Sequence, residues 1–189
     1  MRFIGIFGIA AFLLGLYLAF FIHSKIWYSF FVVGGFLFLE YVNSKRGNSI
    51  FSDKKRFLSL FFAFFVAGII IEIIGNLLLN MWKLPDLNKS EYIFHVLLIG
   101  YPFACLFGLE FLTLLMQLLR SKKARFIILP FSAIIFGFVN EYINTYAYEW
   151  KYNPLLFGEL FGIPIAILFS WMLLLLTIPI HMLIKKLVR

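Results

Sequence analysis

The chain has 189 residues, of which 63% are hydrophobic and only 14% are charged, and 26 of them are Phe. A soluble helical bundle needs a polar face on every surface helix, and so few charged residues cannot supply one. The net charge of +8 suggests nucleic acid, but the basic residues lie in short clusters between apolar stretches, where anionic lipid headgroups are the expected partners. Composition therefore predicts a membrane protein whose partners are membrane lipids, and it argues against nucleic-acid binding.

Six apolar stretches follow one another along the chain, and each reaches roughly the 17 to 25 residues that a bilayer requires, the fourth and sixth being long enough to tilt or to extend past the headgroups. They cover residues 3–22, 26–42, 57–79, 92–119, 126–147 and 155–184. Helices satisfy their own backbone hydrogen bonds in lipid, and the alternation typical of barrel strands is absent. The sequence thus predicts a single all-α transmembrane domain over residues 1–189, with six helices in hairpins 3–42, 57–119 and 126–184.

The basic residues predict the orientation of these helices. Most of the 17 fall at the two ends of the chain and in alternate connections: Arg2; Lys45, Arg46, Lys54, Lys55 and Arg56; Arg120, Lys122, Lys123 and Arg125; Lys185, Lys186 and Arg189. Positive charge marks the cytoplasmic side, so both termini are expected on the cytoplasmic side of a bacterial inner membrane. Trp27, Trp82 and Trp150 fall at the opposite face, where an interfacial aromatic belt is expected.

The second and third hairpins resemble each other in sequence. When Trp82-Lys83 is aligned with Trp150-Lys151, Glu72 falls on Asn140 and Asn76 on Asn144, and Gly100-Tyr-Pro102 falls on Gly162-Ile-Pro164. Both hairpins begin on the cytoplasmic side. The pattern predicts a parallel repeat, with halves related by an axis along the membrane normal.

Polar residues inside apolar stretches supply the candidate site. A carboxylate at the bilayer centre costs about 2.5 to 3.5 kcal/mol on insertion scales, so such residues must face protein or water, or be protonated. Glu72 and Glu141 are the candidate catalytic acids. The candidate substrate-binding residues, at similar depth in the outer half, are Asn76, Asn140, Asn144, Glu159 and His95. Glu40 and Glu110 form a candidate second polar site in the cytoplasmic half, or a structural cap.

These residues allow three functional hypotheses. In the first, Glu72 or Glu141 is a general acid acting on an apolar lipid that the Asn side chains orient. In the second, the same residues form a proton-coupled solute site, with Pro102 and Pro164 as hinges. In the third, Asn and Glu only join helices through interhelical hydrogen bonds, and the protein is a scaffold or assembly factor.

Motifs for other chemistry are missing from the sequence. It contains no HExxH motif and no Cys pair, and its three His residues are scattered, so no metal site and no cofactor are expected. GxSxG, Walker A and GxGxxG motifs are also absent. Soluble hydrolases, nucleotide-driven pumps and dinucleotide enzymes are therefore not indicated.

A pattern over about a quarter of the chain comprises Glu72, Asn76, Trp82-Lys83 and the run LLIGYPFACLFGLE at residues 97–110. This pattern resembles a family of uncharacterised bacterial multi-pass membrane proteins. In that family, a Glu/Asn helix leads through a Trp-containing loop into a Gly- and Pro-containing helix that ends on Leu-Glu. The chain departs from this pattern at loop 84–91, which lacks the aromatics, and at His95, where the family tends to have an acidic residue.

A second set of short motifs comprises Glu72 with Gly75, and Trp150-x-Tyr152 followed by Gly162-Ile-Pro164 and Trp171. These motifs are similar to those of the carotenoid hydratase and lycopene-cyclase-like membrane proteins. The resemblance implies acid-catalysed chemistry on a polyene by membrane carboxylates. It directs the substrate expectation toward an isoprenoid-like lipid.

Overall fold

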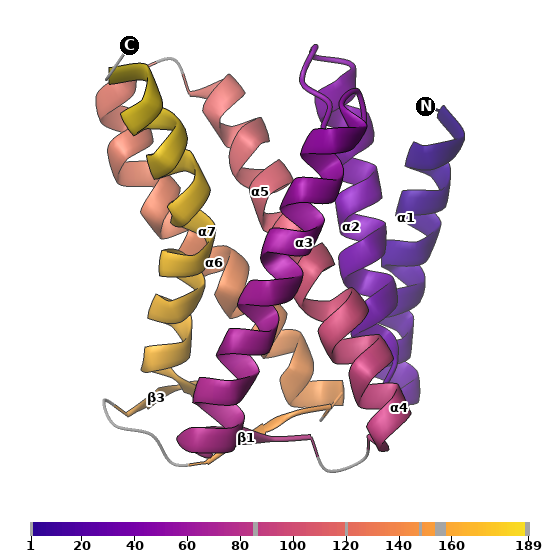
Figure 1. The fold of residues 1–189 in the computed structure, drawn as a ribbon. Coiled ribbons are helices and arrows are strands. Elements are labelled where there is room, and N and C mark those ends of the chain that lie inside the picture. Colours follow the sequence, from indigo (N-terminus) through magenta and orange to yellow (C-terminus); the bar gives the residue numbers. More distant parts are fainter. Residues whose placement is uncertain (1, 85–86, 120, 148, 154–157, 188–189) are drawn as a thin grey trace.

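In the computed structural model, the chain forms a bundle of long helices that run side by side (Figure 1). The structure describes residues 2–84, 87–119, 121–147, 149–153 and 158–187, with side chains up to residue 176. Its α-helices are α1 (Arg2–Tyr17), α2 (Trp27–Ser44), α3 (Lys54–Ile71), α4 (Lys89–Glu91), α5 (Tyr101–Leu118), α6 (Lys122–Ala147) and α7 (Ile165–Leu187). The predicted all-α fold is confirmed.

Three π-helical segments extend these helices. The segment η1 (Leu18–Ile22) continues α1, η2 (Glu72–Leu78) continues α3, and η3 (Tyr92–Gly100) joins α4 to α5. A π-helix closes its hydrogen bonds from residue i to i+5, one residue more than an α-helix, and it often occurs at functional sites. The face that each segment presents is therefore shifted from the one that an α-helical pattern predicts.

Four two-residue strands lie at one end of the bundle, named here the strand end (Figure 1). They are β1 (Trp82–Lys83), β2 (Lys151–Tyr152), β3 (Glu159–Leu160) and β4 (Ile163–Pro164). Strand β1 pairs antiparallel with β2, so that Trp82 lies opposite Tyr152 and Lys83 opposite Lys151, and β3 pairs antiparallel with β4. The β1–β2 pair joins the second predicted hairpin to the third.

Four described helices are long and apolar enough to cross a membrane: Arg2–Ile22, Lys54–Leu78, Lys89–Leu118 and Lys122–Ala147. Large apolar side chains cover their outer faces, with Phe3, Leu77 and Phe126 each at least 79% exposed. The chain is therefore a membrane protein. Helix α2 does not meet the same criterion, and the described side chains of α7 form only a shorter apolar helix at Ile165–Leu176, so the count of six spans stays a prediction.

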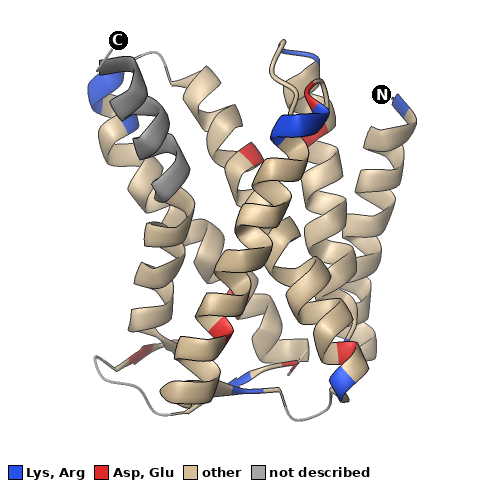
Figure 2. Ribbon diagram, in the orientation of Figure 1, with Lys and Arg blue, Asp and Glu red and all other residues tan. Residues whose placement is uncertain are grey.

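The described basic residues lie at the two ends of the bundle (Figure 2). The end where α1 begins and α7 finishes is named here the basic end, and its described basic residues are Arg2, Lys45, Arg46, Lys54, Lys55, Arg56, Lys122, Lys123 and Arg125. The strand end has Lys25, Lys83, Lys89 and Lys151. The two ends of the chain thus lie on the same, more basic side.

Helix α5 is the central helix, because it contacts α2, α3, α6 and α7. Aromatic side chains fill much of the space around it, and Phe107 packs edge-on against Phe12, Phe31 and Phe136. Helices α1 and α2 pack most closely, since a Cβ at Gly34 would lie 2.2 Å from the backbone nitrogen of Phe12. This core leaves a space at the strand end, between α5 and its neighbours.

Candidate functional site

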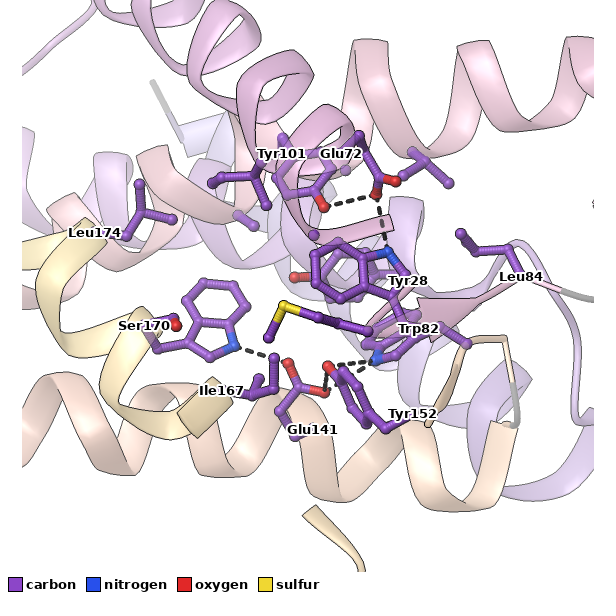
Figure 3. Close-up of a pocket in the computed structure, with 18 of the residues that line it drawn as sticks. Tyr28, Glu72, Trp82, Leu84, Tyr101, Glu141, Tyr152, Ile167, Ser170 and Leu174 are labelled. Atoms are coloured by element: carbon purple, nitrogen blue, oxygen red, sulfur yellow. Dashed lines mark hydrogen bonds between the residues drawn. The ribbon is translucent and has the colours of Figure 1, made fainter. Parts of the chain in front are cut away.

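A cavity of about 320 Å³ lies toward the strand end, with walls from η2, α5, α6 and α7 and with residues of β1 and β2 at its end. Its lining is mainly apolar, and six aromatic side chains contribute to it: Tyr28, Trp82, Tyr101, Trp150, Tyr152 and Trp171. The acidic residues of the lining are Glu72, Glu141 and Glu149, and no Lys or Arg is among the lining residues. Figure 3 shows Glu72 and Glu141 on opposite sides of this space.

Glu72 is the first residue of η2 and is only 6% exposed. Its carboxyl accepts hydrogen bonds from the hydroxyls of Tyr101 at 2.7 Å and Tyr92 at 2.8 Å. It also accepts from the Trp82 indole Nε1 at 3.3 Å and from the Asn76 amide at 3.1 Å. All four of these contacts among the described residues come from donors to the carboxyl oxygens.

Glu141 lies on α6, is 3% exposed and has a similar environment. Its carboxyl accepts from the Trp150 indole Nε1 at 2.9 Å, the Tyr152 hydroxyl at 2.7 Å and the Trp171 indole Nε1 at 2.8 Å. Burial, followed by the charge of Glu141, raises the pKa of Tyr152 well above its usual range, so its hydroxyl stays a donor. Indole and phenol groups thus solvate both carboxyls in place of water.

Glycine makes room for three of these rings. A Cβ at Gly68, four residues before Glu72, would lie 2.6 Å from Tyr101, and one at Gly137, four residues before Glu141, would lie 2.5 Å from Trp171. At Gly75 it would lie 1.9 Å from the Trp82 ring. No side chain fits at those distances, so the face of α3–η2 that carries Gly68 and Gly75 points toward other parts of the protein. The glycines let aromatic donors reach the carboxyls.

Glu149 is the third acidic residue of the lining and is 3% exposed. Its Oε2 atom has no hydrogen-bond partner among the described residues. Burial raises the pKa of this carboxyl well above its ordinary value, because the carboxylate form would lose its hydration. Sequence reasoning did not include Glu149, which lies beyond the last apolar residue of α6.

The cavity opens on the side of the bundle. Ile70 of α3 and Ile74 of η2 line it and are 50% and 48% exposed, and Ser170 of α7 lines it and is also exposed. Residues of α3–η2 and of α7 that line the cavity are thus also exposed at the surface of the bundle.

The predicted Asn residues have different positions from those expected. Asn76 supports Glu72, but Asn144 bonds both the backbone oxygen of Trp150, at 2.7 Å, and its backbone nitrogen, at 3.2 Å. Asn140 donates to the backbone oxygen of Phe136 at 2.7 Å, within its own helix. Neither Asn140 nor Asn144 lines the cavity. Asn144 instead holds the backbone of Trp150, whose indole Nε1 donates to Glu141.

Glu159 and His95 lie outside the cavity lining, in contrast to their predicted roles. Helix α7 begins only at Ile165, so Glu159 lies before it, exposed in β3, where it pairs with Pro164. The His95 Nδ1 atom lies 2.8 Å from the Ser29 hydroxyl, which links η3 to α2. Both side chains therefore lie apart from this cavity, and their substrate-binding role stays a prediction.

Glu40 and Glu110, the predicted second polar site, are fully buried toward the basic end. The Glu40 carboxyl accepts from the backbone nitrogens of Ile50, at 2.9 Å, and Phe51, at 3.3 Å, and from the Ser49 hydroxyl. The Glu110 carboxyl accepts from the Asn43 amide. Neither residue is among those lining the cavity at the strand end. Of the two earlier interpretations, these contacts fit the structural cap.

The aromatic donors are the main residues that sequence reasoning missed. Trp82 and Trp150 were assigned to an interfacial belt, yet Trp82 is only 9% exposed and both indoles point to carboxyls. Trp27 is likewise fully buried. A usable signal was present, since a Gly four residues before a buried Glu occurs in both α3–η2 and α6.

The structure also bears on the register of the sequence repeat. The alignment on Trp82 and Trp150 pairs Glu72 with Asn140. The residue whose contacts correspond to those of Glu72 is instead Glu141, one position later in the chain. The π-helix η2 lies between Glu72 and Trp82, whereas α6 continues as an α-helix beyond Glu141. Gly100 lies within a continuous helix and Gly162 in the β3–β4 turn with φ +75°, so local structure differs at that aligned pair. The repeat therefore stays a prediction.

A search of family models, of curated proteins and of solved structures finds no match to the chain in any of the three.

Proposed function

We propose that the cavity binds an apolar lipid and that Glu72 and Glu141 contact the functional group of that lipid. The observation that carries this proposal is the arrangement of two buried carboxyls, each solvated by aromatic donors, around an apolar cavity that opens sideways. Sites for small molecules are usually apolar hollows with a few well-placed polar groups.

A purely structural role explains this arrangement less well. Glu side chains that only join helices need partners but no empty volume between them, as at Glu40 and Glu110. Intramembrane ionisable residues cost about 2.5 to 3.5 kcal/mol on insertion scales, and they usually mark a binding site or a proton pathway. A lined cavity of ligand size beside two such residues favours binding.

The transporter hypothesis has less support from the contacts. A proton or solute pathway would link Glu72 to Glu110 through polar groups. The buried residues of α5 between Tyr101 and Glu110 are Pro102, Ala104, Cys105, Leu106, Gly108 and Leu109, and Phe36 and Phe64 pack with Cys105, Leu106 and Leu109. This apolar layer favours a site that is reached from lipid.

The orientation proposed from the charges places the cavity in the outer half of a bacterial inner membrane, with both termini in the cytoplasm. The basic end carries most of the described Lys and Arg residues, as expected for a cytoplasmic face. Reporter fusions after Lys55 and Arg125 should read cytoplasmic, and a fusion after Lys89 should read external. A cytoplasmic signal at Lys89 would overturn this topology.

Within this proposal, an isoprenoid-like lipid fits both the cavity and the resemblance of the Glu72 and Trp150–Trp171 motifs to carotenoid-modifying enzymes. A carboxyl that exchanges a proton beside an apolar chain is suited to acid catalysis on a double bond. The Asn76 amide and the Tyr and Trp donors would hold that carboxyl in place.

The proposal is tested by purifying the protein in a mild detergent and extracting its bound lipids for mass spectrometry. One lipid class should be enriched several-fold over the membrane extract. G75W should abolish the enrichment, because its Cβ would lie 1.9 Å from the Trp82 ring and must displace that ring from the cavity lining. The control is L77W, at an outward-facing residue of the same segment that is 79% exposed. Equal lipid profiles for wild type and G75W would contradict a ligand in this cavity.

A further inference from the structure

The cavity has acidic groups and no basic group among its lining residues. Glu72, Glu141 and Glu149 line it, and each is at most 6% exposed. Buried carboxylates are normally paired with a cation, because removal of water from an isolated charge costs several kcal/mol or more. Among the described residues that line the cavity, no Lys or Arg supplies such a cation.

Glu149 adds an independent observation to the charge count. Glu149 lines the cavity, and its buried Oε2 atom has no hydrogen-bond partner among the described residues. Buried polar atoms are satisfied in the great majority of cases, so such an atom indicates a bound group or water. A group that donates a hydrogen bond or carries positive charge would satisfy it.

The aromatic lining indicates the same kind of group. Trp82, Trp150 and Trp171 line the cavity together with Tyr28, Tyr101 and Tyr152, and Figure 3 shows Tyr28, Trp82, Tyr101 and Tyr152 around it. The faces of such rings attract cations, and cages of aromatic side chains bind quaternary ammonium groups. An anionic head, such as a phosphate, would be repelled by the three carboxyls.

We propose that the natural occupant is an amphiphilic cation, an apolar chain with an amine or quaternary ammonium head that lies among the three carboxyls and the aromatic rings. The chain would pass outward between Ile70 and Ile74 on one side and α7 on the other. This inference rests on the proposed function and adds the charge of the ligand to it. It does not extend to a metal ion, because no group of three His, Cys, Asp or Glu side chains among the described residues could hold one.

The test compares three ligands with the same twelve-carbon chain and different heads: dodecyltrimethylammonium, dodecanol and dodecyl phosphate. The protein is placed in nanodiscs of an uncharged, zwitterionic lipid, and binding is followed by the fluorescence of the Trp residues, three of which line the cavity. The cation should bind about tenfold or more tightly than the alcohol, as expected for a cation in a desolvated aromatic site. The phosphate should bind more weakly than the alcohol.

Matched variants separate the cavity from the general charge of the protein. E141Q and E149Q should each reduce the preference for the cation over the alcohol about tenfold, and among the described residues Oε2 of Glu149 has no hydrogen bond that E149Q would break. E159Q replaces a carboxyl at an exposed strand outside the cavity and should leave the preference unchanged.

The outcomes of the two proposals differ. If dodecanol binds as tightly as the cation, the cationic head is refuted while lipid binding stands. If none of the three ligands binds, lipid binding itself is refuted, and the charge inference with it. If E159Q lowers the preference as much as E141Q and E149Q do, the preference comes from surface charge, and the cavity inference is overturned.

Discussion

Two pairs of buried glutamates occupy opposite ends of this bundle and have different surroundings. Glu72 and Glu141 accept almost entirely from Tyr hydroxyls and Trp indoles and lie beside a cavity. Glu40 accepts from two backbone nitrogens, and Glu110 from the Asn43 amide, and neither lines that cavity. Burial of a carboxyl within the bundle therefore does not by itself distinguish a binding site from a structural cap. Its hydrogen-bond partners and the presence of a neighbouring cavity make that distinction.

The largest expected effect is on stability, at the capping pair. E40Q should lower the free energy of unfolding by about 3 kcal/mol, because the amide that replaces one oxygen faces backbone donors that cannot turn away. Such a loss corresponds to a fall of about 6 to 12 °C in the melting temperature for a chain of this size. Melting in detergent checks it, and ligand binding by the surviving folded protein should be unchanged. A melting temperature within 2 °C of wild type would remove the distinction between the pairs.

The second effect is on ligand binding, through the glycines that seat the aromatic rings. G137A places a Cβ where the Trp171 ring lies, so the indole should move away from Glu141. We expect lipid binding to weaken about tenfold, the equivalent of about 1.4 kcal/mol for one lost charge-assisted hydrogen bond. The matched control is I135A, at an outward-facing residue of the same helix that is 58% exposed. Binding that is equally weakened in both variants would contradict a role for the ring.

A third, smaller effect on stability is expected at the cavity pair itself. E72Q should lower the free energy of unfolding by only about 1 kcal/mol, since the Tyr92 and Tyr101 hydroxyls can rotate to accept from the new amide. Activity or ligand-coupled proton exchange should nevertheless be lost, because Gln cannot donate and recover a proton. A strain that depends on the protein provides the readout. Full complementation by both E72Q and E141Q would favour the scaffold hypothesis.

The last effect is a pH dependence that arises from Glu149. Its pKa is raised above the ordinary value of 4.5, so above that pH the folded protein retains a proton that the unfolded chain has released. Stability should therefore fall as the pH rises from about 4.5 toward the raised pKa, by at most about 1.4 kcal/mol per pH unit. Melting curves between pH 5 and pH 8 should show a smaller slope for E149Q than for wild type. An identical slope would show that Glu149 does not bind that proton.

The sequence predicted the helical architecture well, because long apolar stretches have few stable alternatives in lipid. It also identified Glu72 and Glu141, since an acidic residue inside an apolar stretch is conspicuous. It did not predict that Trp82 and Trp150 turn inward, because an interfacial belt and a set of buried hydrogen-bond donors consist of the same residue types, Trp and Tyr. The π-helix η2 shifts the register by one residue, and this placed Asn140 rather than Glu141 opposite Glu72 in the alignment. Glu159 was misplaced because the apolar stretch begins well before α7 does.

The β1–β2 pair has a consequence for the order in which the protein is made. Trp82 and Lys83 pair with Tyr152 and Lys151, which are synthesised after α5 and α6. Glu72 can bond Tyr92 and Tyr101 as soon as the second hairpin is inserted, whereas Glu141 must wait for Trp150, Tyr152 and Trp171. During synthesis, the Glu72 side of the cavity can therefore form before the Glu141 side. The β1–β2 pair at the end of the cavity can form only after β2 has reached the same side of the membrane as β1.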